Sequence, residues 1–176
     1  MRQRKGFTLL ELLVVIGIIS LLLSLLVVLI KNMVTKARVT KTATLIKVLS
    51  EGCSRYRVET GGFPPQSPYS DSRCLHFYLG KELRIVTGRD LDGKALGYKT
   101  LPPIVPFKAD MLDLPAGQET LDPVVRPPVP VIDAWGNPIL YRPYPGQQNP
   151  SAVDIWSTGN DQTAPEDDIT NWNKEF

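Results

Sequence analysis

The sequence has little of the side-chain chemistry that most enzyme classes need. It contains one histidine, His76, and two cysteines, Cys53 and Cys74. No Ser/His/Asp or Cys/His arrangement and no phosphate-binding loop is present, and two cysteines without further Cys or His partners do not make a zinc site. They are too few for a disulfide scaffold, although a single Cys53–Cys74 bridge is an alternative to two buried thiols. We therefore expect a protein that is not an enzyme.

Proline and charge are both missing from much of the N-terminal part. All 16 prolines follow residue 63, and residues 12–30 carry no charge. As a helix these 19 residues would span roughly 28 Å, close to the hydrocarbon thickness of a bilayer. The basic start, with Arg2, Arg4 and Lys5, favours a cytoplasmic N-terminus. The net charge of +2 points to no particular partner, and no basic-aromatic surface predicts nucleic-acid binding.

A short basic leader precedes the apolar run and ends at Gly6. The order Lys-Gly-Phe-Thr-Leu-Leu-Glu over residues 5–11, followed by the aliphatic run, resembles the class III signal of type IV pilins and type II secretion pseudopilins. The resemblance implies that a prepilin peptidase cuts after Gly6 and that Phe7 becomes N-methylated. A plain single-pass anchor is one alternative. A cleaved secretory signal is another, but it has a shorter apolar core and an A-x-A site, which residues 32–34 do not offer.

Glu11 is a carboxylate at the start of an otherwise apolar membrane segment, which is a costly position. Phe7 and Glu11 are four residues apart and share one helical face. The resemblance implies that Glu11 neutralises the amine of Phe7 on a neighbouring subunit. An unpaired carboxylate in an apolar bundle costs several kcal/mol. The pair would therefore stabilise only the register of neighbouring subunits that brings Glu11 to the amine. Alternatively, Glu11 only favours the helix N-terminus through the macrodipole.

These patterns predict an α+β fold in which a long N-terminal helix, transmembrane in its first half, packs on a small antiparallel sheet in a pilin-like manner. The expected regions are a leader at 1–6, a transmembrane helix at 7–30, an amphipathic continuation at 31–60, a variable loop region at 61–130, and a β-sheet and calcium-loop region at 131–176. The continuation follows from a stretch without Pro or Gly. Its expected apolar stripe consists of Val34, Ala37, Leu45, Val48 and Leu49.

The C-terminal third contains the expected sheet. A turn at residues 135–138 leads into a predicted strand at 139–144, and alternation around Val153, Ile155 and Ser157 predicts its partner. A short helix is expected within 74–83. D-x-W-G-N-P at residues 133–138 and S-x-G-x-D…D-D-I-x-N-W at residues 157–172 resemble motifs of the major pseudopilins.

An acidic cluster follows the second predicted strand and contains Asp161, Glu166, Asp167 and Asp168. Hard carboxylate and carbonyl oxygens suit Ca²⁺. The family resemblance implies a calcium site here, with Asp161 and Asp168 as ligands, a backbone carbonyl from Thr158, and a contribution from Asp167. The alternative is a solvated acidic turn.

The resemblance also implies a function. The chain would be a single-pass inner-membrane protein with a periplasmic C-terminal domain, assembled as a homo-oligomeric periplasmic pseudopilus filament that drives type II protein secretion. Its partners would be minor pseudopilins, the inner-membrane assembly platform and the prepilin peptidase. The main alternative is a minor pilin-like subunit or a type IV pilin with a role in adhesion, DNA uptake or assembly priming. A metal-dependent enzyme on a membrane anchor is a third reading, but its carboxylates lie in one short segment without a general base.

Overall fold

The computed structural model describes residues 9–69, 71–115, 128–163 and 168–172. The chain forms two compact units, Met1–Arg38 and Val39–Phe176. Helix α1 runs from Leu9 to Thr60, so the predicted single long helix is confirmed. It ends where Gly61 adopts φ +86° and donates its N–H to the carbonyl of Arg57 at 2.8 Å, a left-handed C-terminal cap that favours glycine.

In the first unit the apolar side chains of α1 are exposed. Leu9, Leu21 and Leu25 have 82%, 63% and 61% of their surface accessible, and their aliphatic neighbours are similarly open. The helix is long and apolar enough to cross a membrane. Because water is a poor solvent for such a surface, this part of α1 needs lipid or other apolar segments around it.

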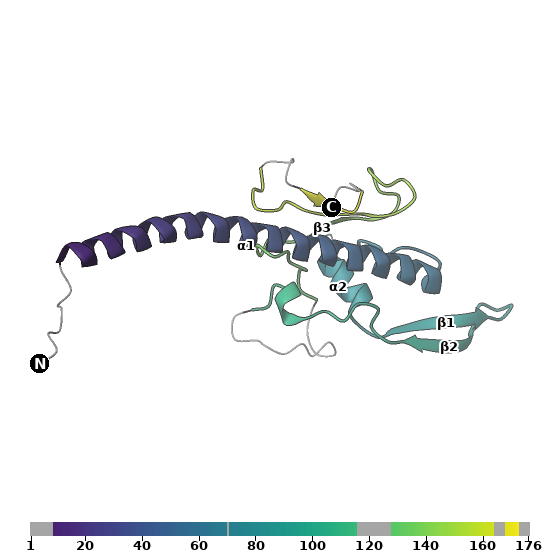
Figure 1. Cartoon of the computed structure of the whole chain (residues 1–176). Coiled ribbons are helices and arrows are strands. Elements are labelled where there is room, and N and C mark those ends of the chain that lie inside the picture. The colour runs from purple at the N-terminus through teal and green to yellow at the C-terminus, as the bar shows by residue number, and fades with distance from the viewer. Residues whose placement is uncertain (1–8, 70, 116–127, 164–167, 173–176) are drawn as a thin grey trace, which may run out of the picture. The chain divides into compact units, whose positions relative to one another are not determined.

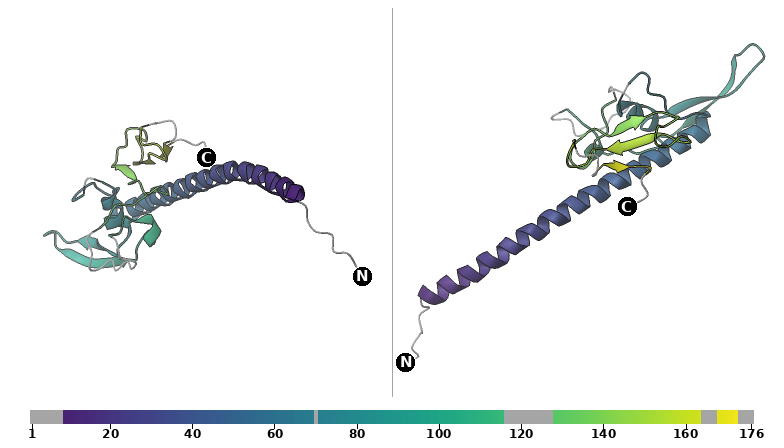
Figure 2. Two further views of the ribbon diagram at one scale, coloured as in Figure 1. Left: turned by 90° about the vertical axis from the view of Figure 1, so that its left-hand side faces the viewer. Right: turned by 90° about the horizontal axis from the view of Figure 1, so that it is seen from above.

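The second unit contains a three-stranded antiparallel sheet in the order β3-β4-β5. Its strands are β3 at Leu140–Arg142, β4 at Asp154–Ser157 and β5 at Ile169–Thr170. In the register of the sheet, Tyr141 pairs with Ile155 and Trp156 pairs with Thr170. The predicted antiparallel pair of strands is confirmed. Within this unit the sheet lies along one side of α1, and helix α2 lies on the other side (Figures 1 and 2).

The core of the second unit lies between α1, α2 and the sheet. Its fully buried apolar residues include Leu49, Cys53, Cys74, Leu75, Leu79, Val131 and Ile155. The predicted apolar stripe is only partly right. Leu45 and Leu49 are buried, but Val48 is 38% exposed and Val34 is 47% exposed. The buried face of α1 contains Thr42 beside Leu45, Ile46 and Leu49. A search for apolar residues alone does not include Thr42, because its side chain carries a hydroxyl.

The sequence predicted a variable loop region at residues 61–130, and the described residues of this range include regular secondary structure. They contain helix α2 at Arg73–Leu79, strands β1 at Leu83–Arg89 and β2 at Ala95–Leu101, and a 3₁₀ turn, η1, at Ala109–Met111. The short helix predicted within 74–83 corresponds to α2. The two strands were missed because their sequences mix apolar residues with glycine, threonine and charges and give no clear alternation.

Strands β1 and β2 form a two-stranded antiparallel ribbon that extends from the second unit (Figures 1 and 2). Leu101, at its base, is the only buried residue of the two strands. An ion pair between Lys99 and Glu59, with N and O atoms 2.9 Å apart, ties the ribbon to α1. On the ribbon itself the Arg84 guanidinium lies 4.1 Å from the ring centroid of Tyr98. This ribbon therefore rests on few contacts with the core.

Candidate functional site

The N-terminal candidate residues surround the start of α1. The helix begins at Leu9, which places Glu11 in its first turn with an exposed side chain. A carboxylate there is favoured by the partial positive charge of the helix N-terminus. Gly6 and Phe7 lie outside the described residues, so the pairing of Glu11 with a Phe7 amine stays a prediction.

The two C-terminal motifs are joined through a buried carboxylate. Asp133 is 4% exposed, and its Oδ2 accepts a hydrogen bond of 2.6 Å from the hydroxyl of Ser157. Its Oδ1 accepts hydrogen bonds from the backbone N–H groups of Trp135 and Asn137, each at 2.8 Å. The side-chain amide of Asn137 in turn donates to the carbonyl of Gly159 at 2.8 Å. The turn at 133–138 and the start of the loop after β4 are therefore one hydrogen-bonded unit.

The same unit is attached to α1. The buried hydroxyl of Thr42 accepts a hydrogen bond of 3.2 Å from the backbone N–H of Ala134. At the end of the sheet, Asn171 accepts from the N–H of Ile155 at 3.0 Å and donates from its amide to the carbonyl of Val153 at 2.9 Å. Sequence reasoning missed these roles because the partners are far apart in the chain, and no local pattern signals them.

The predicted calcium ligands follow this unit. Thr158 is half-buried directly after β4, and Gly159 turns the chain with φ +63°. Asp161 is exposed, and its Oδ1 accepts hydrogen bonds from the N–H and the hydroxyl of Thr163 at 2.9 and 2.7 Å. These hydrogen bonds lower the pKa of the Asp161 carboxyl. Asp168 is half-buried beside β5, and Asp167 lies outside the described residues.

Within the described ranges, no group of three or more His, Cys, Asp or Glu side chains is placed to hold a metal ion. That observation concerns only part of the loop, because residues 164–167 are not described. Calcium binding therefore stays a prediction for these residues.

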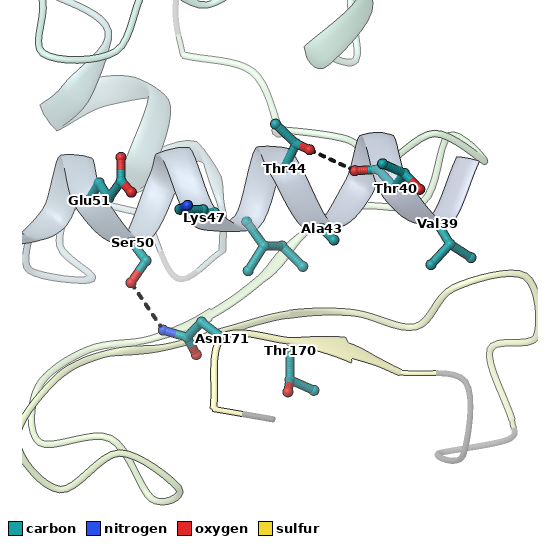
Figure 3. Close-up of a pocket in the computed structure, with 10 residues that line it drawn as sticks. Val39, Thr40, Ala43, Thr44, Lys47, Ser50, Glu51, Thr170 and Asn171 are labelled. Carbon is teal, nitrogen blue, oxygen red and sulfur yellow. Dashed lines mark hydrogen bonds between the residues drawn. The ribbon is translucent and has the colours of Figure 1, made fainter. Parts of the chain in front are cut away.

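A groove of about 560 Å³ lies between α1 and β5 (Figure 3). It is lined by Val39, Thr40, Ala43, Thr44, Ile46, Lys47, Ser50, Glu51, Thr170 and Asn171. Figure 3 shows the side-chain amide of Asn171 reaching across the groove to the hydroxyl of Ser50, at 3.5 Å. Aliphatic and hydroxyl groups predominate, which suits packing more than acid–base chemistry.

Cys53 on α1 and Cys74 on α2 are both fully buried and are free thiols in the structure. Burial raises the pKa of Cys74 to about 12, and burial together with the nearby Cys74 raises the pKa of Cys53 further. Thiols in such surroundings are poor nucleophiles. A Cys53–Cys74 bridge stays a prediction.

Comparison with known proteins bears on the N-terminus. The chain matches the prokaryotic N-terminal methylation motif over residues 1–27. The motif and the fold, a long N-terminal helix followed by small antiparallel sheets, support a type IV pilin-like protein with a prepilin-type signal. The motif suggests processing by a prepilin peptidase, and with the apolar helix it supports anchoring in a membrane. Such subunits are typically structural and non-enzymatic. No curated protein and no solved structure matches the chain.

Proposed function

We propose that this chain is a structural subunit of a periplasmic pseudopilus filament that drives type II protein secretion, and that it has no enzymatic activity. The observation that carries the proposal is the methylation motif over residues 1–27, which includes most of the apolar segment of α1, where the apolar side chains are exposed. A helix of this kind is stable in a bilayer, and its lipid contacts can be replaced by packing against the helices of other subunits. The subunit would be stored in the inner membrane with its second unit in the periplasm.

The choice of a major pseudopilin rests on the C-terminal motifs. The residues that resemble the major pseudopilins, D-x-W-G-N-P and the S-x-G-x-D segment, are in contact through Asp133, Ser157, Asn137 and Gly159. Contact between the two segments supports the interpretation that both belong to one pseudopilin-like structural unit. The partners would be further copies of the chain, minor pseudopilins and the inner-membrane assembly platform.

A minor pilin-like subunit or a type IV pilin is the second candidate. The β1–β2 ribbon favours it, because the ribbon lies in the part of the sequence that shows no resemblance to the major pseudopilins and almost none of it is buried. A feature of this kind suits a subunit with its own binding role.

Deletion of the gene in its host, with complementation by the full chain, tests the proposal. We expect proteins that are normally released to the medium to accumulate in the periplasm of the deletion strain, and the full chain to restore their release. Normal secretion together with a loss of adhesion or DNA uptake would contradict the secretion role and favour the second candidate.

We also propose a Ca²⁺ ion in the loop between β4 and β5, held by Asp161 and Asp168, with Asp167 and the Thr158 carbonyl as further ligands. The donor set is all oxygen, as Ca²⁺ prefers, and a cation would offset the repulsion among the acidic groups. Binding to the folded form alone would stabilise it by about 2.7 kcal/mol at a hundred times the dissociation constant.

Melting temperatures with a chelator and with millimolar calcium test the calcium site. A chelator should lower the melting temperature of the wild-type chain, and Asp161→Ala should lower it similarly and remove the chelator effect. Asp113→Ala, which changes an exposed carboxylate outside this loop, serves as the control. Equal melting temperatures of the wild type in both conditions would show that the loop is only a solvated acidic turn.

A further inference from the structure

Three cations follow the apolar segment of α1 directly. Lys31, Lys36 and Arg38 lie within eight residues of Ile30, and their side chains are exposed. No Asp or Glu occurs in the sequence between Glu11 and Glu51. In the part of the chain that the structure describes, neither Lys31 nor Arg38 is in an ion pair. We call these three residues the basic collar.

Helix geometry places Lys31 at the depth of the lipid headgroups, and Lys36 and Arg38 just beyond it. At about 1.5 Å per residue, Lys31 lies about 1.5 Å beyond Ile30 and Arg38 about 12 Å beyond it. The headgroup region on each side of a bilayer is about 5–8 Å thick, and long Lys and Arg side chains can bend back toward it. Lys31 and Arg38 are seven residues apart, so they lie on the same face of the helix.

We propose that the basic collar binds anionic phospholipid headgroups in the leaflet next to Ile30, at the C-terminal end of the apolar segment. Lys31 and Lys36 would act as point charges beside the phosphates, and the planar guanidinium of Arg38 would donate two parallel hydrogen bonds to one phosphate. Each cation near an anionic surface adds about fivefold to the affinity for it. The inference rests on membrane anchoring by α1, which the proposed function requires.

Lys41 provides an internal contrast. It follows the basic collar on the same helix, but its ammonium lies 2.6 Å from the carboxylate of Asp110 in η1. That pair neutralises the charge without any lipid. The basic collar therefore ends at Arg38, because the next cation of α1, Lys41, is neutralised by a carboxylate of the protein itself.

The consequence concerns the departure of the subunit from the membrane. Contacts with headgroups at Lys31, Lys36 and Arg38 must break when α1 leaves the bilayer. Anionic lipid would thus hold the stored subunit in the membrane and set part of the cost of its extraction into a filament.

Quenching of a tryptophan by brominated lipids tests the proposal on the full chain. Ile30→Trp places the reporter at the boundary next to the collar, and the native tryptophans, Trp135, Trp156 and Trp172, give a constant background. The protein is reconstituted in phosphatidylcholine vesicles that contain brominated phosphatidylglycerol or brominated phosphatidylcholine. We expect quenching to show at least about a threefold preference for the anionic lipid. It should fall to about unity in Lys31→Gln/Lys36→Gln/Arg38→Gln.

Controls separate the possible outcomes. Lys41→Gln should retain the preference, because Lys41 is paired with Asp110, and added inorganic phosphate at matched ionic strength should also leave it unchanged. No preference in the wild type, or the same preference in the triple variant, would overturn the proposal. Loss of the preference with inorganic phosphate would indicate a general anion site instead. Failure of the wild-type chain to float with vesicles would contradict membrane anchoring itself and so the proposed function.

Discussion

Asp133 is a buried carboxylate whose two oxygens serve two segments of the fold. One oxygen holds the turn that begins with Asp133 itself, and the other accepts the hydroxyl of Ser157 at the end of β4. A buried acceptor that loses its donor also loses the compensation for its removal from water. The hydroxyl of Ser157 is therefore part of what holds the acidic loop to the rest of the sheet.

Ser157→Ala tests this role. Because it leaves Oδ2 of a buried Asp133 without its donor, we expect a loss of about 1.5–3 kcal/mol in the free energy of unfolding. The control is Ser54→Ala, since the hydroxyl of Ser54 is exposed and bonds only to the carbonyl of Ser50 in its own helix. Denaturant unfolding of the full chain in detergent would measure both. Equally small losses in the two variants would contradict the role given to Ser157.

His76 predicts a pH dependence of stability. Its Nδ1 accepts a hydrogen bond of 3.1 Å from the backbone N–H of Val129, and its ring packs edge-on against Phe107. Burial lowers the pKa of His76 below its ordinary value of 6.5. As the pH falls below about 6.5, the unfolded chain takes up the proton first, so the free energy of unfolding decreases until the lowered pKa of the folded state is reached.

Unfolding free energies of the wild type and His76→Gln between pH 7.5 and pH 5 would check this. Carboxylates titrate in both proteins, so the difference between the two curves isolates the imidazole. We expect the wild type to lose more stability than the variant below pH 6.5. Parallel curves over that range would show that folding does not lower the pKa of the half-buried His76.

At the scale of elements, the β1–β2 ribbon is the part that the fold needs least. An isolated two-stranded hairpin is marginally stable in water, and this ribbon buries only Leu101 of its strand residues. Leu83 pairs directly with Leu101, so the strands can be closed at that pair. The exposed Lys99–Glu59 ion pair contributes no more than about 1 kcal/mol.

Replacement of residues 84–100 by an Asn-Gly turn should therefore lower the melting temperature by no more than about 4 °C.

Gly52→Val serves as the comparison, because it changes the core instead of the ribbon. A Cβ at Gly52 would lie 2.7 Å from Cγ2 of Val105 and 3.3 Å from Cδ1 of Leu79. Overpacking of this kind costs about 1–3 kcal/mol. If the chain without the ribbon no longer unfolds cooperatively, the ribbon is part of the stable core and this prediction is wrong.

The elements differ in how far their sequences predict them. Helix α1 has no proline and a continuous apolar run, and β3 and β4 have a turn and alternating residues, so local patterns were sufficient. The ribbon and the buried face around Thr42 were not predicted, since glycine, threonine and charges interrupt the hydrophobic pattern. The contacts of Asp133 with Ser157 could not be predicted either, because they join residues 24 positions apart.

At the scale of the whole molecule, we expect Glu11 to be needed for assembly into a filament but not for insertion into the membrane. The apolar segment does not need this carboxylate to enter a bilayer, and its removal makes the segment more apolar. We expect Glu11→Leu to float with membranes as the wild type does and to assemble poorly, because the partner for the Phe7 amine of a neighbouring subunit is lost. Glu11→Asp, which keeps the charge, should retain part of the assembly. Normal filament yield from Glu11→Leu would end the pairing hypothesis.

The most direct test of the central claim is electron microscopy of cells that overexpress the full chain together with the prepilin peptidase and the other components of the secretion system. We expect filaments built from this chain, with each subunit beginning at a methylated Phe7 in the reconstructed density. Absence of such filaments, although the processed chain is abundant in the membrane, would contradict the account of a filament subunit.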